Sequence, residues 1–147
     1  MFLRIVYTKF MVKEKHKLPT STIDLFHEYC KGIDEWPESW EIDEKDIKIV
    51  HDLVALFKPF IISLIEKGLS KKTVKSYRNY LRALGGELIR EVNDDKSNRR
   101  LSAKELVLKC VNDTGGPLWF HAYSEADHAK YDSVCKRFLE FLTKSSN

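Results

Sequence analysis

The sequence predicts an all-α protein, a single-domain bundle of about four to five helices. Two long segments, residues 46–67 and 70–92, place apolar residues three to four positions apart, which is the spacing of a helix with one buried face. Shorter helical segments with Ser or Thr at the start flank them. No internal repeat and no convincing sheet pattern interrupts this series, so the class is all-α.

The first third of the chain is predicted to be less regular. Residues 1–19 are rich in β-branched and aromatic residues and are expected to form a short strand or an ordered arm. A short helix is expected over residues 20–32. Residues 33–46 are acidic and contain Trp36 and Trp40, and they are expected to form a loop.

Three positions predict how the long helices begin and where they bend. Asp43 is expected to cap the first, with Asp46 in place of the usual glutamate of a capping box. Pro59 lies within this helix and predicts a kink or two shorter segments. The pair Gly85-Gly86 lies within the second helix, where each glycine costs about 1 kcal/mol relative to alanine, so we expect a bend or break.

The last third of the chain predicts two further helices. A short one begins at Ser102, and a longer one begins after Ser124. Between them, the turn "TGGPLWF" is expected to place Trp119 and Phe120 in the core.

Composition is typical of an intracellular globular protein. The 147 residues suit one domain, and a hydrophobic content of 43% is enough for one core. Three widely spaced cysteines indicate a reducing compartment. No secretory signal and no run of roughly 20 apolar residues is present. We expect a cytoplasmic protein without membrane association, divided into an arm, short helix and acidic loop over 1–42 and a helical domain over 43–147.

The clearest functional signal is the charge of residues 67–86, which contain six cations and no carboxylate. At about 100° per residue, four of the cations form one ridge on the predicted helix. The ridge comprises Lys71, Lys75, Arg78 and Arg82. It lies beside a predicted buried stripe, which comprises Val74, Tyr77, Leu81, Leu84 and Leu88.

Like charges at this spacing repel one another, so the absence of interspersed glutamates favours a partner that supplies negative charge. Phosphates do so well, because bound cations release condensed counterions from the nucleic acid. An ordinary solvated basic face is the alternative, and the acidic segment 34–46 could fold back over it.

Residues 57–84, "FKPFIISLIEKGLSKKTVKSYRNYLRAL", resemble the N-terminal core-binding domain of tyrosine recombinases, the phage-integrase family, which has a SAM-like fold. The pattern is carried by Gly68, Leu69, Ser70, Lys71, Lys72, Thr73, Tyr77 and Leu81. Looser similarity extends over about residues 44–144. The resemblance implies a domain of four or five helices that contacts duplex DNA from one side, in the context of DNA integration and recombination by mobile elements.

In that family a catalytic domain with arginines, a histidine and a nucleophilic tyrosine follows. This chain ends at Asn147 and contains no His-x-x-Arg, so we expect it to be non-catalytic. Tyr123 and Tyr131 lack the groups that would activate a nucleophile. His27 and Cys30 have a metal-like spacing, but zinc needs four converging ligands, and neither a metal site nor a cofactor is expected.

We therefore expect a non-catalytic domain that binds double-stranded DNA. The residues expected to contact phosphates are Lys71, Lys72, Lys75, Arg78 and Arg82, helped by Arg99, Arg100, Lys136 and Arg137. Tyr77 and Leu81 are expected to hold the basic helix against its neighbour. The alternative is a protein-interaction or regulatory module, in which the acidic and tryptophan-bearing segment 34–46 meets a protein partner or a second copy.

Overall fold

The structure, a computed structural model, describes residues 21–40 and 43–145. Its helices are α1 (Thr22–Tyr29), α2 (Trp36–Trp40), α3 (Ile47–Glu66), α4 (Lys71–Asp94), α5 (Ala103–Cys110) and α6 (Glu125–Ser145), with short 3-10 helices η1 (Ile33–Glu35), η2 (Glu44–Asp46) and η3 (Lys96–Arg100). The all-α class is confirmed. In these ranges the only pairing of β type is an isolated bridge between Asn112 and Gly115. The arm predicted for residues 1–19 lies outside the described residues.

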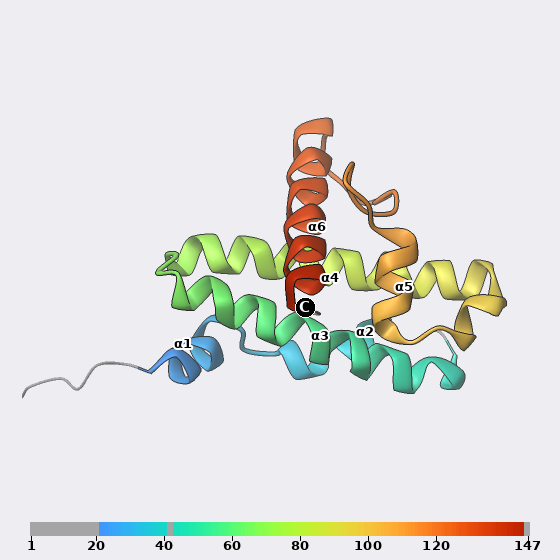
Figure 1. The fold of residues 1–147 in the computed structure, drawn as a ribbon, viewed down its shortest axis with the longest axis horizontal. Coiled ribbons are helices and arrows are strands. Elements are labelled where there is room, and N and C mark those ends of the chain that lie inside the picture. Colours follow the sequence, from blue (N-terminus) through green and yellow to red (C-terminus); the bar gives the residue numbers. More distant parts are fainter. Residues whose placement is uncertain (1–20, 41–42, 146–147) are drawn as a thin grey trace, which may run out of the picture.

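Helices α3 and α4 lie side by side in opposite directions and form the base of the fold (Figure 1). Helix α6 crosses this pair and packs against α4, and α5 packs against α3. Helices α1 and α2 contact α3 and α4. None of the helices within the two described ranges combines the length and the apolar composition needed to cross a bilayer. The SAM-like arrangement implied by the resemblance stays a prediction.

The predicted buried stripe of α4 faces the core. Its members Val74, Tyr77, Leu81, Leu84 and Leu88 are all buried, which confirms that part of the prediction. Burial of such side chains stabilises a helix far more than its intrinsic propensity does.

The same core continues into the N-terminal helices. Phe57 of α3 lies 5.1 Å, between ring centroids, from Phe138 of α6. Phe57 also lies 6.4 Å, between ring centroids, from Trp36 of α2. Phe26 of α1 belongs to the same cluster of buried residues. The boundary predicted at residue 42 therefore does not separate two hydrophobic cores.

Helix α4 is continuous through Gly85 and Gly86, so the predicted break is wrong. A Cβ on Gly85 would lie 2.3 Å from Cζ2 of Trp40, which means that the missing side chain makes room for the indole. The indole Nε1 donates a hydrogen bond of 3.0 Å to the carbonyl oxygen of Arg82. Packing of Trp40 into this notch offsets the low helix propensity of the two glycines.

Helix α3 also continues, through Pro59, and is not divided into two segments. Proline removes the hydrogen bond to the carbonyl four residues earlier, which belongs here to Ala55. Both residues are exposed, so that carbonyl lies on the solvent side of the helix.

The predicted acidic loop folds instead into η1, α2 and η2. Trp36 and Trp40 are each only 6% exposed, and their ring centroids lie 5.7 Å apart. The two tryptophans therefore cover the core and are not a surface on which a protein partner could dock. Asp34 of the same segment pairs with Lys58 at 2.6 Å and does not fold over the basic ridge.

Asp46 does not take the capping-box role predicted for it. Its side chain is fully buried and makes no cap hydrogen bond. The carboxylate accepts hydrogen bonds from Asn93 Nδ2 at 2.8 Å and from Arg99 Nε at 3.1 Å. Asp43 caps the short helix η2, where it accepts from the backbone N–H of Lys45 at 2.9 Å. The ion pair with Arg99 thus joins the start of α3 to η3, and the hydrogen bond from Asn93 joins it to the end of α4.

Candidate nucleic-acid interface

The basic surface is built on the first half of α4. Gly68 takes a positive φ of 85° at the end of the preceding turn. Ser70 then caps the helix by accepting from the backbone N–H of Thr73 at 3.2 Å. Because the buried stripe turns one side of α4 to the core, the residues on the opposite side face outward.

Two of the predicted ridge cations hold α1 against α4. Lys71 pairs with Glu28 of α1 at 3.0 Å. Arg78 donates from Nη1 to the carbonyl oxygen of Tyr29 at 3.0 Å and from Nη2 to Asn79 Oδ1 at 3.0 Å. Two of the four ridge cations are therefore already engaged within the chain, Lys71 by a carboxylate and Arg78 by a backbone carbonyl.

Three cations on the same half of α4 remain available. Lys72 and Arg82 are exposed, and Lys75 is half-buried. Within residues 21–40 and 43–145, no carboxylate lies within ion-pair distance of any of the three. We call Lys72, Lys75 and Arg82 the α4 basic face.

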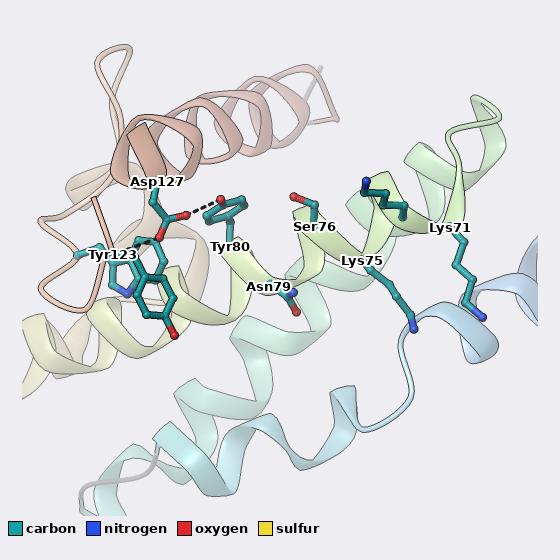
Figure 2. Close-up of a pocket in the computed structure, with 9 residues that line it drawn as sticks. Lys71, Lys75, Ser76, Asn79, Tyr80, Tyr123 and Asp127 are labelled. Atoms are coloured by element: carbon teal, nitrogen blue, oxygen red, sulfur yellow. Dashed lines mark hydrogen bonds between the residues drawn. The ribbon is translucent and has the colours of Figure 1, made fainter. Parts of the chain in front are cut away.

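A groove of about 810 Å³ opens along the outer side of α4. Helix α4 contributes Lys71, Lys72, Lys75, Ser76, Asn79 and Tyr80, and the opposite wall contributes Trp119, Tyr123 and Asp127. Figure 2 shows the labelled lysines toward one end of this groove and the labelled tyrosines and Asp127 toward the other. The site thus has a cationic half and an aromatic half.

Asp127 organises the aromatic half. Its carboxylate accepts from the Tyr80 hydroxyl at 2.7 Å and from the backbone N–H of Tyr123 at 3.2 Å. Burial, together with this carboxylate, raises the pKa of Tyr80 to about 12, so the hydroxyl stays protonated and acts as a donor at neutral pH. Trp119 lies edge-on to Tyr80, with ring centroids 5.9 Å apart.

Hydrogen bonds hold the segment that carries Trp119 against α6. His128 Nε2 accepts from the backbone N–H of Trp119 at 3.1 Å, and the other ring nitrogen faces Asp132 at 3.1 Å. Asp132 also accepts from the backbone N–H of Gly116 at 3.1 Å, and the Tyr131 hydroxyl donates to the Pro117 carbonyl at 2.8 Å. These bonds fix the aromatic wall relative to α4.

Trp119 and Phe120 do not both enter the core as predicted. Trp119 is half-buried against Tyr80 and Tyr131, but Phe120 is 65% exposed. The guanidinium of Arg90 lies 5.6 Å from the centroid of the Phe120 ring. Phe120 is exposed because it lies in the turn that follows Trp119, which is closed by a hydrogen bond from the backbone N–H of Ala122 to the Trp119 carbonyl at 3.4 Å.

The other cations predicted to help in DNA contact lie elsewhere. The Arg99 side chain is only 17% exposed and is paired with Asp43 and Asp46, so its guanidinium is engaged within the chain and is not available to contact phosphates. Arg100 is exposed at the end of η3, which follows α4, and the end of α4 at Asp94 lies about 33 Å along the helix from Lys72.

Lys136 and Arg137 lie on α6 and are exposed. The Arg137 guanidinium donates to the Tyr77 hydroxyl and lies 5.9 Å from its ring centroid. Arg137 lines a different groove, with Lys67 and Lys144. The nine predicted contact residues are therefore not brought together on one surface.

Comparison with known protein families, curated proteins and solved structures found no match to this chain. The described residues also bring no three His, Cys, Asp or Glu side chains into an arrangement that could hold a metal ion. The groove and the α4 basic face are therefore the features from which a function can be inferred.

Proposed function

We propose that this protein is a non-catalytic DNA-binding module that contacts phosphates through the α4 basic face. The observation that carries the proposal is the charge of the first half of α4. Residues 67–86 contain six cations and no carboxylate. Five of these cations lie on α4, and three of the five, Lys72, Lys75 and Arg82, make no ion pair and no side-chain hydrogen bond in the described part of the chain. Cations in this state release counterions from DNA without first breaking an internal ion pair.

The relation of this surface to the core supports the same function. The buried side chains of α4 fix the helix against α3 and α6, so the outward lysines project from a rigid element. A rigid cationic helix contacts a phosphate backbone without ordering a flexible segment first. The resemblance to the core-binding domain of tyrosine recombinases points to the same helix and makes duplex DNA the expected ligand.

The test is fluorescence polarisation with a labelled duplex of random sequence at two salt concentrations. We expect micromolar binding that weakens as salt rises. The double charge reversal Lys72→Glu and Lys75→Glu should weaken binding by about tenfold or more and reduce the salt slope by about two. Arg78 is left unchanged, because its guanidinium holds α1 and a carboxylate there would disturb the fold.

The matched control is Lys45→Glu with Lys48→Glu, which changes the net charge by the same amount. Both residues are exposed, and they lie next to the start of α3, at the opposite end of the base from the start of α4 (Figure 1). This variant should bind nearly as wild type does. Equal weakening by both pairs, or no binding at low salt, would overturn the proposal.

The protein-interaction alternative can no longer use the two tryptophans as its contact surface. Its two tryptophans are buried, and Asp34 is engaged by Lys58. It becomes the better account if the duplex fails to bind at low salt.

A further inference from the structure

The aromatic half of the groove contains a feature that contact with phosphates does not use. Tyr123 is 96% exposed, the largest exposure among the exposed large hydrophobic side chains of the described residues. Its backbone is nevertheless fixed, because its N–H donates to Asp127 at 3.2 Å. An aromatic ring that stands in water on a fixed backbone has an open π-face on which another planar group can stack.

The two halves of the groove differ in charge and therefore favour different groups of a ligand. The cationic half attracts phosphates through Lys72 and Lys75. The Asp127 carboxylate in the aromatic half repels them, because like charges at close range cost free energy. A ligand that fits both halves therefore carries an anionic backbone and a planar, uncharged side group.

Single-stranded DNA has this composition. Its phosphates follow cationic grooves and its bases stack on aromatic side chains with little dependence on sequence. In a duplex, the two faces of each base are covered by neighbouring base pairs, so Tyr123 would add little to duplex binding.

We propose that the groove binds an unpaired nucleotide, with the strand's phosphates on Lys72 and Lys75 and a base stacked on Tyr123. This inference rests on the proposed function, because it uses the same lysines. It adds a preference for single strands that carry unpaired bases over abasic strands and over fully paired DNA. Trp119 and Tyr80, in edge-to-face contact at 5.9 Å, form the back of the stacking site.

The experiment compares two labelled single strands of equal length, oligothymidine and an abasic strand with the same phosphates. The wild-type chain should bind oligothymidine about 5- to 100-fold more tightly than the abasic strand. Tyr123→Ala should remove this preference, and Tyr123→Phe should retain it, because the ring is kept. The ring is almost fully exposed, so neither substitution should alter folding.

Phe120→Ala is the matched control, since Phe120 is an exposed aromatic of the same segment that does not line the groove. It should keep the full preference for oligothymidine. The inference is overturned if wild type binds both strands equally, or if Tyr123→Ala keeps the preference.

The duplex assay separates the two proposals. If the duplex binds through Lys72 and Lys75 but the strands show no dependence on bases, only the stacking inference fails. If neither strand nor duplex binds in a salt-dependent way, the proposed function fails with it.

Discussion

Alanine substitutions at Gly85 and Gly86, which line the notch between α2 and α4, are predicted to have opposite effects on the free energy of unfolding. A Cβ on Gly85 would lie 2.3 Å from Trp40 Cζ2, whereas nonbonded carbon atoms settle at about 3.5–4.0 Å. The indole would therefore have to move by more than about 1 Å. Its movement is restricted, because its ring packs against Trp36 and Phe57 and its Nε1 donates to the Arg82 carbonyl.

The magnitude for Gly85→Ala follows from three contributions. Overpacking a filled site costs about 1–3 kcal/mol. A weakened hydrogen bond from Trp40 costs about 1 kcal/mol, and the higher helix propensity of alanine returns about the same amount. We expect a net loss of about 1–3 kcal/mol in the free energy of unfolding.

Gly86→Ala is the built-in control. Its Cβ would lie 3.5 Å from Trp40 Cδ1, which is an ordinary contact, so we expect a gain of up to about 1 kcal/mol. Urea unfolding followed by far-UV circular dichroism measures both variants. If Gly85→Ala is as stable as wild type, or if both variants shift in the same direction, Trp40 does not occupy the notch and the reasoning is refuted.

Two further predictions concern the core and its thiols. Arg99→Ala leaves the fully buried carboxylate of Asp46 without its cation, so the free energy of unfolding, measured with urea, should fall by about 3 kcal/mol. Arg100→Ala should change the free energy of unfolding by no more than about 0.5 kcal/mol, because Arg100 is exposed. Equal effects of the two substitutions would contradict the assigned ion pair. Burial raises the pKa of Cys30 to about 11. In native protein at pH 8, Cys30 should therefore be alkylated more slowly than the less buried Cys110, as followed by mass spectrometry. In denatured protein the two cysteines should react at similar rates. Because the folded pKa of Cys30 is the higher one, its contribution to stability is present below about pH 9 and is lost as the pH rises through about 11, and a Cys30→Ala variant should show less of this alkaline loss.

Local periodicity was enough to predict the helices and the inward side of α4. Val74, Leu81 and Leu88 recur at helical spacing, and this pattern is independent of what packs against them. The interruption expected at Gly85 was wrong, because the compensating group, Trp40, is far away in sequence. Propensity alone cannot include a contact of that kind.

The candidate site was predictable only in part for the same reason. The cationic pattern of α4 is local, but the partners of Lys71 and Arg78 are on α1, which docks from 43 and 49 residues earlier in the chain. The aromatic half joins Tyr80 to Trp119 and Tyr123, which only the crossing of α6 over α4 brings together. The one local signal was Tyr80, an aromatic residue outside the buried stripe.

Lysine acetylation footprinting with and without duplex DNA tests the central claim most directly. In the free protein, Lys72 should react faster than Lys71, which is paired with Glu28. With DNA bound, Lys72 and Lys75 should become protected while Lys45 and Lys48 keep their rates. Unchanged reactivity of Lys72 and Lys75 in the presence of bound DNA would contradict the account.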